Sequence, residues 1–79
     1  MKSLSHTTKV TVRRALAALR RADTILEEAP PMGNALMYEE LVLNPHRNLS
    51  QHVSTKAGFR NRADLEAFAG KHHMLKSQQ

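Results

Sequence analysis

The chain has 79 residues, a net charge of +5 at neutral pH and no cysteine. This length allows one small domain, and the lack of cysteine excludes disulfides, thiolate metal sites and a cysteine nucleophile. No apolar run approaches the ~20 residues that cross a bilayer, and no secretory signal is visible, so we expect a cytoplasmic protein without membrane contact. Residues 1–22 are acid-free and contain four arginines, a composition that mitochondrial presequences share.

Charge is distributed in three blocks along the chain. Residues 1–21 carry six basic groups and no acid, and residues 22–44 carry five acids and no base. Residues 45–79 carry six basic groups against two acids. Because a basic surface attracts polyanions, these blocks favour DNA or RNA as a partner, although solvation of a small helical protein gives the same composition.

The first predicted element is a long amphipathic helix from about Thr8 to Glu28. One half of its helical wheel is apolar and holds Val12, Ala15, Leu16, Ala18, Leu19, Ala22, Ile25 and Leu26. The polar half carries arginines in two adjacent pairs seven residues apart, which form two parallel ridges: Arg13, Arg14, Arg20 and Arg21. Asp23 is expected to pair with Arg20 within the helix.

Residues 29–34 contain two prolines and a glycine, which end this helix. Asn34 is expected to cap a second helix, Ala35–Leu43, that stops before Pro45 because the residue preceding a proline avoids the helical region. The same residues could form a short strand, but a lone strand would have no partner. The residues of this helix expected to face the core are Leu36, Met37, Tyr38 and Leu41.

A third helix is predicted from Pro45, with Asn44 as its cap. Its apolar residues recur every four positions, at Leu49, Val53 and Ala57, and Gly58 is suited to the left-handed residue that ends it.

The fourth helix is predicted to start at Asn61, its cap, and to stop at Gly70. Phe59 and Phe68 are expected to pack against each other. The fold class is therefore all-α: a single domain, residues 1–79, in which one long and three short helices form a small bundle or a helix-turn-helix variant. We expect an ordered core over residues 8–70, with flexible ends at 1–7 and 71–79.

The last two helices carry a family resemblance. The residues Val53, Lys56, Gly58, Phe59, Arg62 and Ala63, with the alternation through Ala69, resemble the closing pattern of the LuxR-type helix-turn-helix DNA-binding domain. The resemblance implies that the helix from Pro45 lies in the major groove of DNA and that the last helix supports a homodimer.

No pattern typical of an enzyme is present. The three glycines form no phosphate-binding loop, and Glu39 and Glu40 are adjacent and so point about 100° apart on a helix. His46 and His52 are six residues apart, a poor spacing for one helical face, while His72 and His73 fall in the expected tail. We therefore expect no catalytic activity, no cofactor and no metal.

Two functions remain. The first is a small transcription-regulating protein that binds duplex DNA, in which Arg47, Asn48 and Gln51 approach base edges while Lys56, Arg60 and Arg62 contact phosphates. The second is a protein-binding regulator, such as a phage-type inhibitor or adaptor on a host machine like RNA polymerase. In that case the four ridge arginines meet an acidic protein surface, such as that of a transcription-machinery subunit.

Overall fold

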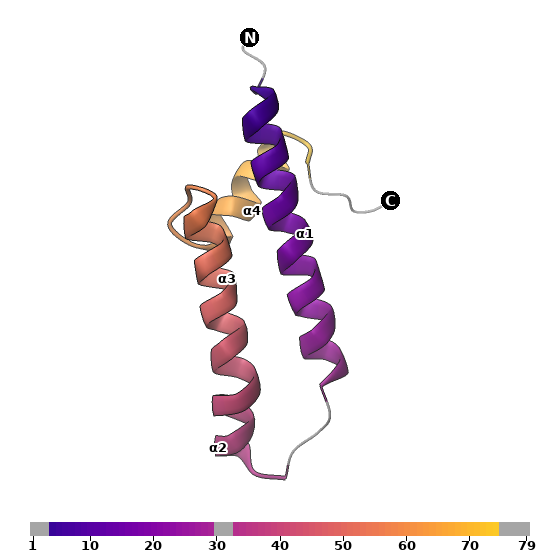
Figure 1. Cartoon of the computed structure of the whole chain (residues 1–79), viewed down its shortest axis with the longest axis vertical. Helices are drawn as coiled ribbons and strands as arrows, with labels where there is room; N and C mark the ends of the chain where they lie inside the picture. The colour runs from indigo at the N-terminus through magenta and orange to yellow at the C-terminus, as the bar shows by residue number, and fades with distance from the viewer. Residues whose placement is uncertain (1–3, 30–32, 75–79) are drawn as a thin grey trace.

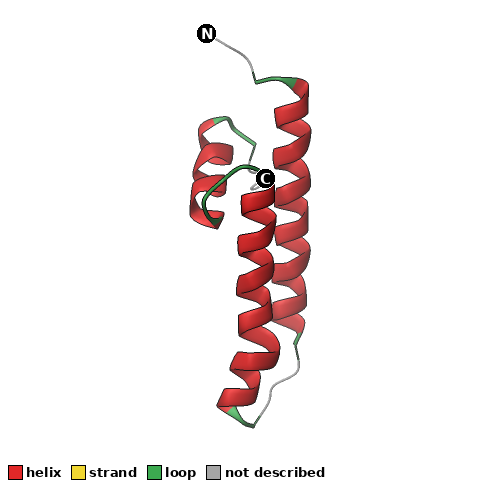
Figure 2. Cartoon of the chain, turned by 60° about the vertical axis from the view of Figure 1, so that its left-hand side comes forward, coloured by secondary structure: helices red, strands yellow, loops and turns green. Residues whose placement is uncertain are grey.

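The computed structural model describes residues 4–29 and 33–74, and this part of the chain is helical without any strand (Figure 1). Its elements are α1 (His6–Glu28), α2 (Ala35–Tyr38), the π-helical turn η1 (Glu39–Leu43), α3 (Asn44–Lys56) and α4 (Arg62–Lys71). The prediction of an all-α chain is confirmed. Figures 1 and 2 show an elongated hairpin in which α1 and α3 run side by side in opposite directions, with short α4 at the end where α1 begins.

The first helix begins two residues earlier than predicted, because a serine caps it. The side chain of Ser5 accepts a hydrogen bond from the backbone N–H of Thr8 at 3.1 Å and so satisfies a donor that the first turn leaves free. The helix ends at Glu28 as predicted. The predicted break at Pro30 and Pro31 lies outside the described residues.

The second and third predicted helices are one continuous helical segment, Ala35 to Lys56, so the described chain has three helices where four were expected. The strand alternative for residues 35–43 and the predicted stop before Pro45 are both wrong. A proline inside an α-helix clashes with the carbonyl four residues earlier and lacks an N–H. Here the preceding turn widens into η1, where the N–H of Asn44 donates to the carbonyl of Glu39, five residues back. This wider turn accommodates Pro45 without ending the helix.

Two of the predicted helix caps and the turn agree with the sequence. Asn34 accepts bonds from the N–H groups of Leu36 (2.9 Å) and Met37 (3.1 Å), and Asn61 accepts one from Asp64 (2.9 Å). Gly58 has a φ of 100°, which only glycine adopts without strain. These predictions for Asn34, Asn61 and Gly58 are confirmed. The predicted cap at Asn44 is wrong: Asn44 has helical backbone angles (φ −65°, ψ −46°) inside the continuous segment, so the segment does not begin there.

The hydrophobic core lies at the α4 end of the hairpin. Val12, Ala15 and Leu19 of α1 are buried there against Leu65 and Ala69 of α4. The predicted aromatic pair is confirmed: the ring centroids of Phe59 and Phe68 are 5.2 Å apart at a tilt of 59°. Ser54 of α3 is also fully buried at this end, and its hydroxyl has no hydrogen-bond partner within the described ranges.

Two predictions about the end of the chain need correction. The last helix runs one residue past Gly70, to Lys71, and residues 72–74 after it are not a free tail. The N–H of Met74 donates to the carbonyl of Ala69 at 2.7 Å, and the Met74 side chain packs against the core. Residues 75–79 of the predicted tail lie outside the described part.

Candidate functional site

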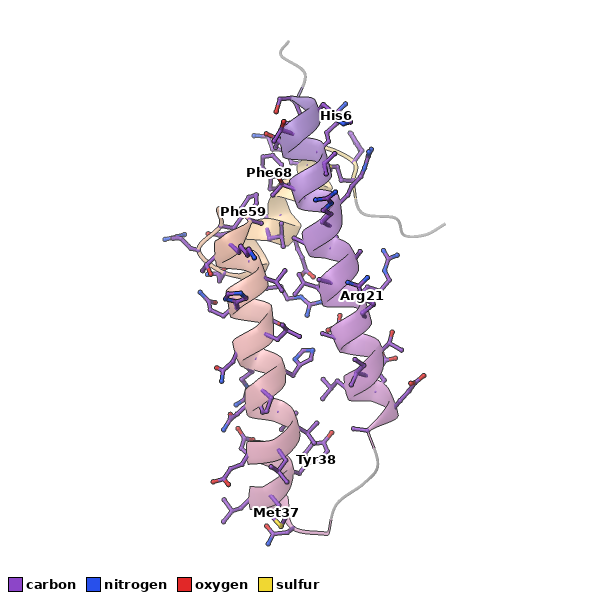
Figure 3. All side chains as sticks on the ribbon, viewed as in Figure 1. His6, Arg21, Met37, Tyr38, Phe59 and Phe68 are labelled. Atoms are coloured by element: carbon purple, nitrogen blue, oxygen red, sulfur yellow. The ribbon has the colours of Figure 1, made fainter. Side chains whose placement is uncertain are left out.

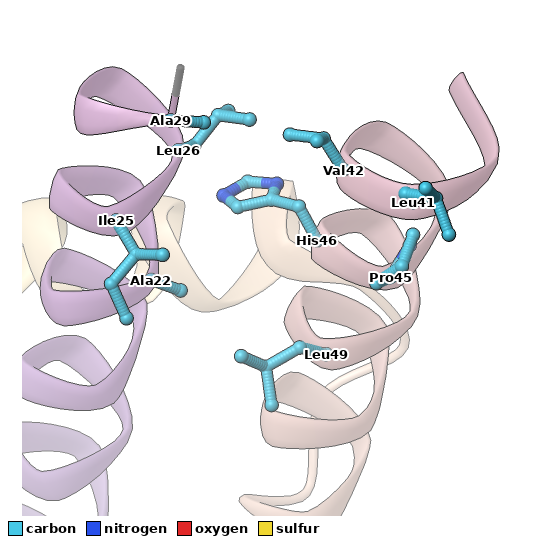
Figure 4. A pocket seen from close by; sticks show the side chains of 9 residues that line it. All are labelled: Ala22, Ile25, Leu26, Ala29, Leu41, Val42, Pro45, His46 and Leu49. Carbon is cyan, nitrogen blue, oxygen red and sulfur yellow. The ribbon is translucent and has the colours of Figure 1, made fainter. Parts of the chain in front are cut away.

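An apolar groove lies near the other end of the hairpin, between α1 and the segment from η1 into α3 (Figure 4). It has a volume of about 240 Å³. Figure 4 shows Ile25 and Leu26 on one side, opposite Val42, His46 and Leu49 on the other. The lining residues are Ala22, Ile25, Leu26, Ala29, Leu41, Val42, Pro45, His46 and Leu49, and we call this set the apolar groove.

Large apolar side chains at this end are exposed to solvent. Ile25 is 69% exposed, Leu41 59% and Leu49 44%, and Leu36 and Met37 nearby are also exposed. The prediction that Leu36, Met37 and Leu41 face the core is therefore wrong, and Tyr38 is only half-buried. A contiguous exposed apolar surface on a small protein is a feature of interaction sites.

The groove is open because the fourth helix is too short to cover it. At about 1.5 Å per residue, the 23 residues of α1 span about 35 Å, whereas the 10 residues of α4 span about 15 Å. The amphipathic face of α1 continues past the part that α4 covers. The sequence predicted that Leu41 faces the core and placed Ile25 and Leu49 on apolar helix faces. The difference in predicted helix length was a signal that part of these faces would lack a cover.

An ionic network connects the groove to α4. Both carboxylate oxygens of Asp23 accept hydrogen bonds from Arg62 of α4, at 2.8 and 2.5 Å, and His46, which lines the groove, lies 2.9 Å from Asp23 Oδ1. Arg62 also donates to Glu66 at 2.9 Å. The expectation that Asp23 pairs with Arg20 is wrong, because the turn after α3 brings Arg62 to the edge of the α1 apolar stripe.

This network shifts two ionisation equilibria. Hydrogen bonds from Arg62, with a smaller effect of His46, lower the pKa of Asp23 to about 2, although partial burial acts in the opposite direction. The same bonds with Asp23, and those with Glu66, raise the pKa of Arg62. The arrangement fixes the orientation of α4 on the hairpin.

Most residues predicted to contact DNA are held by neighbours in the chain. Arg47 donates to Glu39 (2.5 Å) and to Asn44 (2.8 Å), and Gln51 donates to the carbonyl of Arg60 at 2.6 Å.

Two of the predicted phosphate contacts are paired as well. Arg60 is bound to Asp64 at 2.9 Å, and Arg62 belongs to the ionic network. Of the six predicted residues, Asn48 and Lys56 are exposed, and their side chains make no hydrogen bond or ion pair with another described residue. The structure therefore does not bring the six together as one free surface.

The ridge arginines on α1 are in a different situation. Arg13, Arg14, Arg20 and Arg21 are all exposed, and none of them takes part in an ion pair with another described residue. Arg21 is labelled on the outer side of the hairpin in Figure 3. Glu27, Glu28, Glu39 and Glu40 lie nearer the connection between the two long helices. The charge thus changes from basic to acidic along the length of the hairpin.

No group of three or more His, Asp or Glu side chains in the described ranges is placed to hold a metal ion. None of the helices there is long and apolar enough to span a membrane. Comparison with known proteins gives no match to a family model, to a curated protein or to a solved structure.

Proposed function

We propose that this chain is a small regulator or adaptor that acts by binding protein, and that the apolar groove is its docking surface. The observation that carries the proposal is the exposure of Ile25, Leu41 and Leu49 around one concave apolar site. Leaving such side chains in water forgoes about 1.5–3 kcal/mol each relative to full burial, which a docked partner would recover in part.

Electrostatics around the groove support a protein partner over a phosphate backbone. Glu27 and Glu28 follow Ile25 and Leu26 directly in α1, and Glu39 and Glu40 precede Leu41 in η1. Acids concentrated at this end of the hairpin repel phosphate, whereas a protein surface can match them with basic groups.

The experiment is co-purification of the tagged full-length chain from the cells that make it. The test variant is Ile25→Glu/Leu49→Glu, and the control is Ala67→Glu, an exposed position on α4. We expect a discrete polypeptide to accompany the native chain and the control and to be lost with the groove variant, while helix content measured by circular dichroism is unchanged in all three. Equal recovery with the groove variant would contradict the proposal.

A second candidate, duplex DNA binding, is favoured by the four exposed ridge arginines of α1. They can contact phosphates without sequence readout, and the family resemblance in the last two helices stays a prediction. The test is a titration with duplex DNA at two salt concentrations. Binding that weakens steeply with salt in the native chain but not in the variant with all four arginines changed to glutamine would support this candidate. Absence of binding at low salt would exclude it.

A further inference from the structure

We propose that the partner in the apolar groove is a second copy of this chain, docked face to face in the antiparallel direction so that two hairpins complete a four-helix bundle. The inference rests on the proposal that the groove is a protein-docking surface and adds the identity of the occupant. Three features of the described residues support it: the direction of the uncovered face, the charges beside it, and the small size of the core.

The uncovered face of α1 carries a regular stripe next to the groove. At 100° per residue, Arg21, Ile25 and Glu28 lie within about 60° of one another on the helix. These three residues are spaced by four and then three positions. This alternation of three and four is the pattern by which two helices pack along their length. Ile25, at 69% exposure, is the large apolar residue of the stripe.

Two copies of this stripe have complementary charges when they run in opposite directions. Arg21 precedes Ile25 by four residues and Glu28 follows it by three, and both are exposed. In a two-fold pair centred near Ile25, each Arg21 lies opposite Glu28 of the second copy. A parallel pair would instead place like charges opposite each other, arginine on arginine and glutamate on glutamate. The stripe therefore selects one orientation.

The two-fold operation also accounts for the groove. Rotation about an axis that lies between the two copies, parallel to the plane of the hairpin and perpendicular to its helices, places α1 over α1 and α3 over α3 of the second copy. Ile25 and Leu49, which face each other across the groove in Figure 4, then meet the same residues of the other hairpin. Two antiparallel hairpins joined in this way form the four-helix arrangement in which neighbouring helices cover one another's apolar stripes.

A core of limited size favours this partner. The buried apolar residues in the described ranges are Val12, Ala15, Leu19, Ala22, Leu65 and Ala69, and three of these six are alanines. Chains of this size bury a smaller fraction of their surface than larger domains do, and association is a common way to bury more. Each copy brings its own groove, so one symmetric contact covers two exposed surfaces.

The test is sedimentation equilibrium of the full-length chain across a wide concentration range, at low salt. We expect the weight-average mass to rise to twice that of one chain. Arg21→Glu alone and Glu28→Arg alone each place like charges across the two-fold axis and should weaken dimerisation on the order of tenfold. The double variant Arg21→Glu/Glu28→Arg reverses both charges and should restore native dimerisation. Arg13→Glu, which makes the same charge change away from the stripe, is the control and should have little effect.

A native chain that stays monomeric at all concentrations would overturn the inference, as would a double variant that is no better than its single parents. These results are separable from failure of the proposed function. If the native chain is monomeric while Ile25→Glu/Leu49→Glu still abolishes co-purification of a different polypeptide, the groove binds a foreign protein and only the second-copy inference fails. If neither dimer nor groove-dependent partner is found, both proposals fail.

Discussion

Asp23 and Arg62, 39 positions apart in the sequence, form a two-bond ion pair that joins the middle of α1 to the first residue of α4. Each side chain is about one third exposed, at 37% and 30%. A pair in this intermediate position contributes more than a fully exposed pair and less than a buried one. Because α4 supplies two of the six buried apolar residues, this contact helps to decide how the small core is assembled.

Acid should remove the contribution of this pair. The folded-state pKa of Asp23 is about 2, below the ordinary value of 3.8 expected in the unfolded chain, so the stabilisation is present above about pH 4 and is lost as the pH falls towards 2. We expect Asp23→Asn to be less stable than the native chain at pH 6 and the difference to shrink between pH 4 and pH 2. Urea unfolding across this pH range measures it. A stability difference that does not change with pH would rule out the ion pair as its source.

An alanine substitution at Gly58 tests the turn between α3 and α4, and the same substitution at Gly33 is its control. Neither has an atom within 4 Å of the place where a Cβ would be added, but Gly58 has a φ of 100°. Gly58→Ala should therefore cost about 1–2 kcal/mol through backbone strain alone. Gly33→Ala, without a left-handed backbone, should have little effect or a slightly stabilising one. Thermal unfolding of the two variants checks this, and equal stability losses would contradict it.

Replacing Ser54 by alanine should increase the stability of the fold. Its side chain is fully buried and its hydroxyl makes no hydrogen bond to any described residue. Ser54→Ala removes this polar group from the interior and introduces a better helix former, so we expect a gain of about 1 kcal/mol. Thr55→Ala, at the exposed neighbouring position, gives the comparison for helix propensity. A loss of stability in Ser54→Ala would indicate a partner for the hydroxyl.

Two leucines should respond differently to the same substitution. Leu65 is fully buried in the core, whereas Leu41 at the groove is 59% exposed. Leu65→Ala should cost about 2–5 kcal/mol, and Leu41→Ala well under 1 kcal/mol in dilute, unassociated protein. Urea unfolding at low protein concentration measures both. A large cost at Leu41 would mean that the groove residues hold the fold together and are not displayed.

The sequence predicts the local features of this fold well because they depend on neighbouring residues. The caps at Asn34 and Asn61 and the left-handed Gly58 each follow from a rule that spans four or five positions. Helical periodicity likewise gives the correct class and the correct C-terminal limit of α1.

The errors come from interactions between distant residues or from competing local rules. The restriction before Pro45 favoured a break, but the wider η1 turn accommodates the proline within one helix. Periodicity identified Leu36, Met37 and Leu41 as apolar without showing that no helix covers them. The partners of Arg47, Gln51 and Arg60 depend on how the chain turns, so composition alone suggested a free basic surface.

Site-specific photo-cross-linking in the cells that make the protein tests most directly whether the apolar groove is a protein-docking surface. A photoreactive phenylalanine derivative replaces Ile25 or Leu41 in turn, with Ala67 on α4 as the control position. We predict discrete protein adducts from both groove positions and none from the control, with an adduct of twice the chain mass where the second copy is the partner. Absence of adducts from the groove, or the same adducts from all three positions, would contradict the account.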